Sequence, residues 1–419
     1  MSTTRSISES PTPDNNLVQD IQNKKDYIQK ADPLYIRVTL SLFTVGLATF
    51  ALLYFVQPIL PILSEDFGVS PATSSLSLSL STGMLALGLL ITGPLSDAIG
   101  RKNVMVTALS AAAFFTLLSA FMTHWHGILI VRTLVGLSLS GVAAVAMTYL
   151  SEEIHPHFVA LSMGLYISGN AIGGMSGRLI SGVITDHFSW RVSVIVLGLF
   201  ALIAAIMFCR MLPESRHFRP SSLKPKPLLI NLRLHFRDKG LPLLFFEAFL
   251  LMGSFITVFN YISYRLLDSP YHFSQSTVGM LSIVYLAGTY SASKMGRLTS
   301  QYGFGKMLIV TISMMLIGIL ITMLSSIVMI MIGMIILTSG FFAAHAVASS
   351  WVGRRARRAK AQASSLYLFC YYAGSSVAGT FGGIFWLQLG WNGVVLFTTI
   401  LILFALLLGI KLAKFSETK

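Results

Sequence analysis

One acidic side chain lies well inside the long apolar segments of this sequence. Glu247 is followed by Ser254, Tyr261 and Arg265, all within about 40° of it at 100° per helical residue. Because an ionisable group in hydrocarbon costs about 2.5–3.5 kcal/mol, we expect this polar stripe to face a water-filled cavity. Glu247 could carry a proton there. The alternative is a structural carboxylate near its helix end, snorkelling or paired with Lys239.

Histidine and tyrosine supply the other candidates for chemistry. His345 is the only histidine deep in an apolar segment, where it could titrate near neutral pH or simply pack. Tyr166, Tyr367, Tyr371 and Tyr372 could form an aromatic wall for an amphipathic substrate, with core packing as the equal alternative.

The first apolar segment carries helix-breaking residues at its centre. Gln57 precedes Pro58, Pro61 follows, and Tyr54 is one turn away. Proline removes a backbone donor, and broken helices in membranes occur where they line a cavity or are buried in protein. Tyr54 and Gln57 are therefore predicted to face a cavity.

The overall composition indicates the class of protein in which these residues are held. Of the 419 residues 54% are hydrophobic and 11% are charged, with a mean hydropathy of +0.74. A soluble domain carries about 25% charged residues, so soluble, disordered and fibrous classes are excluded. Cys209 and Cys370 both lie in apolar segments, which excludes a disulfide framework and gives no sign of a metal site.

Long apolar runs predict an all-α polytopic membrane protein with twelve transmembrane helices in two six-helix bundles, since about 20 apolar residues span the hydrocarbon. The predicted spans are 36–63, 75–94, 104–122, 127–150, 158–182, 190–212, 241–267, 278–295, 306–324, 327–352, 363–385 and 393–411. The bundles then cover residues 36–212 and 241–411. We expect a disordered tail over 1–35, a cytoplasmic linker loop over 213–240 and a short tail over 412–419.

The net charge of +14 reflects orientation in the membrane. All of the Lys and Arg except Arg132, Arg178, Arg191 and Arg265 fall on one side of this topology. The positive-inside rule then predicts cytoplasmic N- and C-termini. We accordingly expect contact with membrane lipids and no nucleic acid partner.

The two predicted bundles are related in sequence. Leu165-Tyr166 recurs as Leu366-Tyr367, and Trp190 recurs as Trp391, both after 201 residues. Equal offsets at separate places indicate duplicated halves. Parallel halves of this kind are one recognised transporter architecture.

The segment Gly93-Pro94-Leu95-Ser96-Asp97-Ala98-Ile99-Gly100-Arg101-Lys102 connects the second and third spans. From the residues alone it is a tight turn with two cations facing the inner leaflet. The segment also resembles the loop signature of the major facilitator superfamily, G-x-L-x-D-R-x-G-R-K, and departs from it at Ala98. With twelve spans and duplicated halves, this likeness extends over nearly the whole chain after the predicted tail, within a group that resembles drug–proton antiporters.

The resemblance implies a gating loop made of Gly93, Asp97, Gly100, Arg101 and Lys102. In the family the loop aspartate acts as a latch on the N-terminal end of helix 11 when the transporter is open outward. A carboxylate at a helix N-terminus contributes about 0.3–1 kcal/mol, enough to bias two nearly balanced states. The second half has Ser300 in place of the aspartate, so the latch is expected to be asymmetric.

Two further sites are suggested by the resemblance. Arg132 matches the family's buried arginine of helix 4, which is thought to influence proton transfer; the alternative is an ordinary interfacial cation. Gly169-Asn170-Ala171-Ile172-Gly173-Gly174 resembles the antiporter signature G-P-x-x-G-G, with Asn170 in place of proline. Asn170 could therefore offer hydrogen bonds to a substrate, and Arg178, two turns further out, is expected at the outer mouth.

The sequence therefore predicts a proton-coupled secondary transporter that exports a small amphipathic compound by alternating access. Proton coupling is assigned to Glu247, Arg132 and His345. The predicted substrate cavity is lined by Tyr54, Gln57, Tyr166, Asn170, Ser254, Tyr261 and Tyr371. The alternatives are a symporter importing a small metabolite and a non-transporting sensor or scaffold.

The same features favour a monomer in a bacterial inner membrane, powered by the proton gradient and without a cofactor. An intramembrane protease using Gly174-Met175-Ser176-Gly177 with His345 is disfavoured, because twelve spans and duplicated halves do not fit that class. The sequence also lacks a phosphate-binding loop. We therefore do not expect an enzyme.

Overall fold

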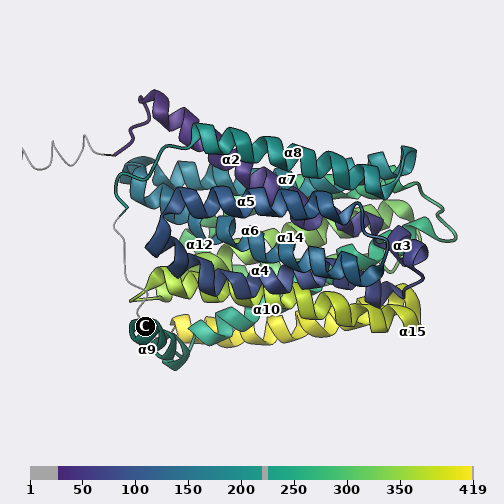
Figure 1. Cartoon of the computed structure of the whole chain (residues 1–419). Coiled ribbons are helices and arrows are strands. Elements are labelled where there is room, and N and C mark those ends of the chain that lie inside the picture. The colour runs from purple at the N-terminus through teal and green to yellow at the C-terminus, as the bar shows by residue number, and fades with distance from the viewer. Residues whose placement is uncertain (1–26, 219–224, 418–419) are drawn as a thin grey trace, which may run out of the picture.

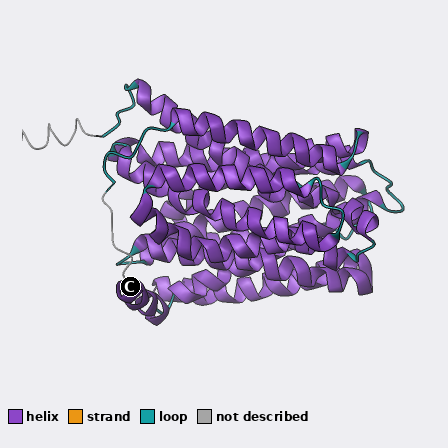
Figure 2. Ribbon diagram, viewed as in Figure 1, coloured by secondary structure: helices purple, strands orange, loops and turns teal. Residues whose placement is uncertain are grey.

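The computed structural model describes residues 27–218 and 225–417, and within them the chain is helical apart from its connections and one isolated β-bridge (Figures 1 and 2). The first half contains α2 (Pro33–Tyr54), α3 (Val56–Phe67), α4 (Pro71–Ile99), α5 (Arg101–Ser119), α6 (Trp125–Glu153), α7 (Pro156–His187) and α8 (Trp190–Met211). The second half contains α10 (Leu241–Leu267), α11 (Gln275–Met280), the short 3-10 helix η1 (Leu281–Val284), α12 (Tyr285–Tyr302), α13 (Phe304–Ile321), α14 (Ile327–Arg355) and α15 (Lys360–Glu417).

Twelve membrane spans are confirmed, six in each half. Ten helical segments are long and apolar enough to cross a membrane by themselves. One of these is α15, which contains two spans joined at Gly390, where φ is 56°. The remaining span is built from α11, η1 and α12 together.

The helix ends follow the local sequence. The Asp32 side chain accepts a hydrogen bond from the backbone N–H of Leu34, with Pro33 at the first helical position, and Ser70 caps α4 in the same way. Such side chains satisfy backbone donors that a helix leaves free at its start.

The first span is interrupted where the prolines predict it. Pro58 cannot donate to the carbonyl of Tyr54, and α2 ends at Tyr54 while α3 begins at Val56. The two pieces stay in line as one span of 35 residues, Pro33–Phe67.

The predicted tails and linker differ from the structure at three places. The predicted N-terminal tail over 1–35 falls outside the described residues up to position 26, but Ile28 is buried and bridges to Ile154. The linker over 213–240 is not a loop throughout, because it contains the helix α9 (Pro225–Arg237). The last helix continues to Glu417, beyond the predicted span end at 411.

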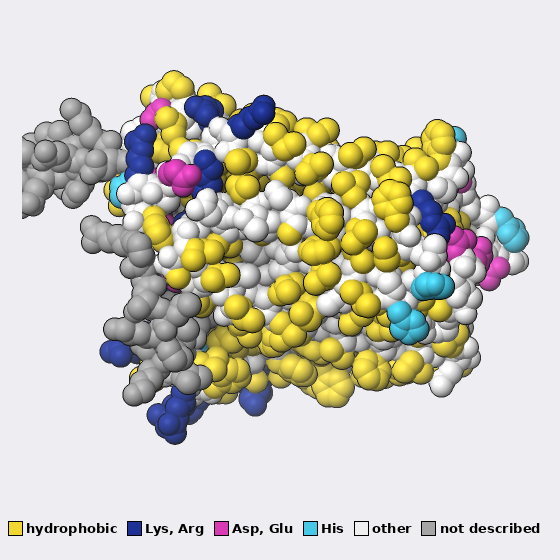
Figure 3. Space-filling model, viewed as in Figure 1, with side chains coloured by type: hydrophobic (Ala, Val, Ile, Leu, Met, Phe, Trp, Pro, Cys, Tyr) yellow, Lys and Arg dark blue, Asp and Glu magenta, His cyan; other side chains and the backbone are white. Residues whose placement is uncertain are grey.

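The outer surface suits a bilayer. Leucine, isoleucine and phenylalanine side chains cover the middle of the molecule, and charged side chains gather at its two ends (Figure 3). One end carries Arg101, Lys102 and Arg355, together with α9 and the C-terminus (Figure 1). We call it the basic end, and the other, which carries Asp66 and Asp186, the opposite end.

The two halves pack closely toward the opposite end. A Cβ atom on Gly182 would meet the backbone of Gln275 and Gly279, and one on Gly383 would meet the backbone of Ala72. Glycine is required here because the helices cross at backbone contact. The Ser276 hydroxyl also donates to Asp186 across this junction at 2.6 Å.

Candidate functional site between the two halves

Glu247 occupies the interior of the second half. Its side chain is fully buried, and neither carboxylate oxygen has a hydrogen-bond partner in the described part of the chain. It forms no ion pair there, so the alternative pairing with Lys239 is not observed. A buried carboxyl group without partners favours its neutral, protonated form.

A tyrosine within electrostatic range of Glu247 contacts a histidine. Tyr367 of α15 interacts electrostatically with Glu247, and the Tyr367 hydroxyl is 2.9 Å from Nδ1 of His345. The His345 ring packs on Tyr371, with 4.7 Å between ring centroids. His345 and Glu247, both predicted for proton coupling, thus lie on either side of Tyr367 in the interior of the second half without touching each other in the described structure.

The stripe on α10 differs from the predicted open cavity. The Tyr261 hydroxyl donates to the carbonyl of Gly379 on α15 at 2.9 Å, and Ser254 donates to its own helix at Leu250. Arg265 bonds to the carbonyls of Thr322 and Leu324. This face of α10 is covered by α15, so the stripe does not face open water in this conformation.

Arg132 makes a set of backbone contacts. Its guanidinium donates to the carbonyls of Leu52 and Leu53, both at 2.9 Å, and to that of Ser77 at 3.0 Å. Leu52 and Leu53 belong to the last turn of α2, where carbonyls lack helical partners because the helix ends. These contacts favour a structural role at the break in the first span; the role in proton coupling stays a prediction.

A polar layer crosses between the halves around Arg178. Nε of Arg178 donates to the Gln57 side chain at 2.6 Å, and Gln57 donates to Asn260 of α10 at 2.7 Å. The Arg178 guanidinium lies over the rings of Tyr54 at 4.6 Å and Tyr285 at 4.8 Å. The predicted cavity residues Tyr54 and Gln57 therefore lie at the junction of the halves.

This layer adds residues that the sequence analysis missed. The Arg178 side chain, expected at the outer mouth, is buried in this conformation against the rings of Tyr54, Phe259 and Tyr285, and its position at the mouth stays a prediction. Asn260 and Tyr285 gave no sequence signal on their own. The near-equivalent placement of Gln57 and Asn260 in the two halves, 203 residues apart, could have suggested Asn260.

The remaining cavity candidates lie on both halves. Tyr166 and Asn170 of α7 pack against Gly46 of α2, and the Asn170 Oδ1 atom is buried without a hydrogen bond to the described residues. On α15, Tyr371 and Tyr372 pack edge to face with centroids 5.1 Å apart. All of these side chains except Asn170 are buried. In this conformation they pack in the core, and an aromatic wall for a substrate stays a prediction.

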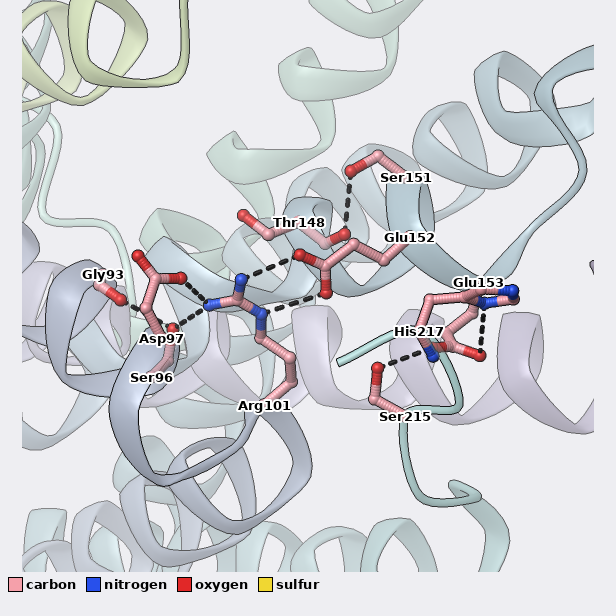
Figure 4. Close-up of polar contacts among 10 residues, drawn as sticks. All are labelled: Gly93, Ser96, Asp97, Arg101, Thr148, Ser151, Glu152, Glu153, Ser215 and His217. Atoms are coloured by element: carbon pink, nitrogen blue, oxygen red, sulfur yellow. Dashed lines mark hydrogen bonds and ion pairs between the residues drawn. The ribbon is translucent and has the colours of Figure 1, made fainter. Parts of the chain in front are cut away.

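The residues of the predicted gating loop lie at the end of α4 and the start of α5, with the turn confined to Gly100. They form a charge network within the first half (Figure 4). Gly100 adopts a φ of 103° that lets α4 turn into α5. Arg101 pairs with Asp97 and donates to both oxygens of Glu152 on α6, at 3.1 and 2.8 Å. The Ser96 hydroxyl donates to the carbonyl of Gly93.

Glu152 is a further member of this network and lies outside the loop motif at 93–102. It reaches Arg101 because α6 packs beside α5, and its position as the first of two acids at the end of α6 was the available signal. Lys102 lies 3.3 Å from Glu214, which follows α8. The network ties the predicted gating loop to its own half in this conformation.

With this geometry established, comparison with known proteins defines the class. The chain belongs to the Major Facilitator Superfamily, whose family model matches residues 42–379. It is 63% identical to the inner membrane transport protein YnfM of Escherichia coli over 98% of this chain and 99% of that protein. It is also 44% identical, over 93% of this chain and 96% of the relative, to the uncharacterized MFS-type transporter YybF of Bacillus subtilis.

Solved structures support the fold. A bacterial homolog of the human lysosomal transporter Spinster, in an inward-facing and occupied conformation, superposes with a TM-score of 0.73 at 13% identity, covering 93% of this chain and 98% of that one. The protein is therefore a secondary transporter of the inner membrane that crosses it many times, in a family of transporters and not of enzymes.

Proposed function

We propose that this protein is a proton-coupled transporter that exports a small amphipathic compound by alternating access. The observation that carries the proposal is Glu247, a carboxyl group buried in the second half without a hydrogen-bond partner among the described residues. Such a group is stable when protonated and costly when ionised, so its charge state changes the relative free energy of conformations that expose it differently.

The charge distribution supports a cytoplasmic location for the basic end. The halves pack closely toward the opposite end, so the described conformation would be the one open to the cytoplasm. Rocking of the two bundles would open the opposite end and bring the gating loop to the N-terminus of α15, where Asp97 would act as the latch.

The proton gradient supplies enough free energy for this work. A proton moving down 100 mV gains about 2.3 kcal/mol, and one pH unit adds about 1.4 kcal/mol. Together these sustain a gradient of a few hundred-fold for a neutral substrate per proton. Export as the direction is supported by the likeness of the α7 segment 169–174 to the antiporter signature.

The test of proton coupling needs no substrate. Spin labels at Ser151→Cys and Gly353→Cys, on the basic ends of α6 and α14, report the opening of that end by electron–electron resonance, with Cys209 and Cys370 replaced by alanine. We expect the distance distribution of the purified protein to change with pH. Glu247→Gln should hold it at the low-pH distribution, whereas Glu65→Gln, which removes an exposed carboxylate, should behave as wild type.

A pH response that persists in Glu247→Gln would refute Glu247 as the coupling group. Direction is tested separately with inverted membrane vesicles and the neutral dye Nile red. Accumulation that requires an acidic interior supports export, and accumulation only in right-side-out vesicles contradicts it.

A further inference from the structure

The guanidinium of Arg178 is a buried cation without a carboxylate partner among the described residues. The Arg178 side chain is 3% exposed and makes none of the ion pairs within residues 27–218 and 225–417. Nε donates to Gln57 and Nη1 to the carbonyl of Gly174. Nη2 has no hydrogen-bond partner there, although the Tyr285 hydroxyl is close enough to interact with the guanidinium.

Arg132 shows that burial alone does not leave an arginine unsatisfied in this protein. All three of its guanidinium nitrogens donate to backbone carbonyls. Both guanidinium groups lie over aromatic rings, Phe55 for Arg132 and Tyr54, Tyr285 and Phe259 for Arg178. Only Arg178 has a nitrogen without a hydrogen-bond acceptor among the described residues. Ring faces attract a cation but do not neutralise it, so this site favours an anion.

A second arginine of the chain shows the geometry that such an anion would adopt. Nε and Nη2 of Arg101 donate to the two oxygens of one carboxylate, that of Glu152. The same edge of Arg178 has Nη2 unpaired and Nε bonded only to the neutral amide of Gln57. A carboxylate is the stronger acceptor and matches this planar edge with two parallel bonds.

Space adjoins the guanidinium. Arg178, Gln57 and Phe259 line a cavity of about 10 Å³ between the halves, which is roughly what one water molecule requires. Tyr54 is at the same place, and its hydroxyl is buried without a hydrogen bond in the described structure. A ligand with an anionic head and a ring-bearing body would find a cation, a free hydroxyl and aromatic faces together when the halves separate here.

We propose that Arg178 binds the carboxylate of an organic anion whose apolar, aromatic body packs against Tyr54 and Tyr285. The inference rests on the proposed transport function and names the substrate class. It also links binding to movement, because a carboxylate on the Nε and Nη2 edge displaces Gln57. Gln57 then loses one of the two contacts that position it to bond Asn260 across the halves, and the opposite end is released to open.

The test compares ligands that differ only in charge. Benzoate and the neutral benzamide are titrated onto the purified full-length protein in detergent, and binding is read from the unfolding temperature and tryptophan fluorescence. We expect benzoate to bind at least about tenfold more tightly than benzamide, since it gains two charge-assisted hydrogen bonds. Benzoate should also shorten the distance between the labels at positions 151 and 353.

Variants assign the effect to the guanidinium. Arg178→Gln should abolish the preference for benzoate, and Arg178→Lys should weaken it because the fork is lost while the charge is kept. Arg191→Gln, which removes a half-exposed arginine at the start of α8, should bind as wild type. Equal binding of benzoate and benzamide by the wild type would overturn the proposal even if the Arg178 variants fail to fold, as would tighter binding of benzylamine.

These experiments distinguish failure of the anion-site proposal from failure of the proton-coupling proposal. Glu247→Gln should retain the preference for benzoate, because Arg178 is intact in that variant. Loss of the pH response in Glu247→Gln without any benzoate preference in the wild type would leave the transporter proton-coupled and refute only the anion site. A benzoate preference in the wild type, together with a pH response that Glu247→Gln leaves unaltered, would support the anion site and refute Glu247 as the coupling group.

Discussion

The basic ends of α6 and α14 occupy equivalent places in the two halves and carry opposite charges. Glu153 ends α6 and accepts hydrogen bonds from Ser215 and the backbone of His217, at the start of the linker. Arg355 ends α14 and pairs with Asp238, at the end of the linker. Each half therefore binds one end of the linker. The first half does so through an acid and the second through an arginine, so the duplication did not preserve the charge of the binding residue.

The duplication did preserve the backbone packing, which is alike in the two halves. Gly100 and Gly303 turn one helix into the next with nearly the same conformation, φ/ψ of 103°/146° and 83°/156°. A Cβ on Gly173 would overlap the carbonyl of Leu47, and one on Gly374 would overlap that of Phe249. The comparison teaches that helix crossings constrain both halves alike, whereas buried charge is free to differ between them.

The largest expected effect tests that shared packing. Gly173→Val and Gly374→Val should each destabilise the protein by about 3 kcal/mol, because backbone that meets backbone cannot move aside. Gly164→Val, on the same helix as Gly173 but with open space around its Cα, is the control. Thermal unfolding in detergent measures all three, and a large difference between the two halves would contradict equivalent packing.

A second test concerns a buried charge that only one half contains. Arg132 of α6 corresponds to Met334 of α14, and the break at Phe55 that Arg132 supports has no counterpart in the continuous α10. Arg132→Met should lower the free energy of unfolding by about 2 kcal/mol, since three carbonyl partners are lost and such bonds in membranes contribute modestly.

The same variant separates the two roles considered for Arg132. If Arg132 is structural, the label distance between positions 151 and 353 keeps its pH response in Arg132→Met although stability falls. An unchanged unfolding temperature with a lost pH response would instead support a role in proton coupling. Met334→Leu, a change of similar volume in the equivalent place, should have little effect on either measurement.

Sequence periodicity predicted the elements and part of the site. Hydropathy located twelve spans, and the prolines at 58 and 61 located the break, because these signals are local. Helical period also placed Glu247, Ser254 and Tyr261 on one face of α10. It could not show that this face packs on α15 while Asn260, on the other side, reaches Gln57 in the first half.

Contacts between distant segments account for what was missed. Glu152 and Arg101 meet because α5 and α6 pack side by side, and Arg178 is buried because α7 packs near Tyr54 of its own half and Phe259 and Tyr285 of the other. A single sequence records neither pairing. The burial of Arg178 in this conformation therefore has a tertiary origin that helical period and hydropathy do not reveal.

The gating loop allows a smaller test of the asymmetry. The Asp97 side chain is 46% exposed and pairs with Arg101, while Ser300 at the equivalent place donates to Gly296 of its own helix. If Asp97 is the latch of the outward-open state, Asp97→Asn should shift the population toward opening at the basic end by about 0.3–1 kcal/mol. The label pair at 151 and 353 should then report a larger share of long distances.

Adding a carboxylate to the other half sharpens this test. Ser300→Asp would face the N-terminus of α7, which starts at Pro156, as Asp97 is proposed to face that of α15. It should increase the share of short distances by a similar amount. Shifts of the same sign in Asp97→Asn and Ser300→Asp would refute equivalent latching positions.

The smallest expected effect is at the linker contact of the second half. The Asp238 carboxylate accepts from the backbone N–H groups of Gly240 and Leu241, both at 2.8 Å, and pairs with Arg355. Asp238→Ala should cost under about 1 kcal/mol, as is usual for partly exposed pairs. Hydrogen exchange of Gly240 and Leu241 should accelerate, while the amide of His217, which is bound by Glu153, should be unaffected.

The pH dependence of this contact has a definite sign. Burial opposes ionisation of Asp238, but Arg355 and the two backbone donors outweigh it and hold the pKa of that carboxyl group below its usual value. A lowered pKa in the folded state stabilises the protein above the ordinary aspartate pKa of about 3.9, and the contribution disappears as pH falls through the lowered value. The difference in unfolding temperature between wild type and Asp238→Ala should thus be constant from pH 5 to 7 and shrink below about pH 4. A difference that grows on acidification would mean that Asp238 is not held as an anion by Arg355.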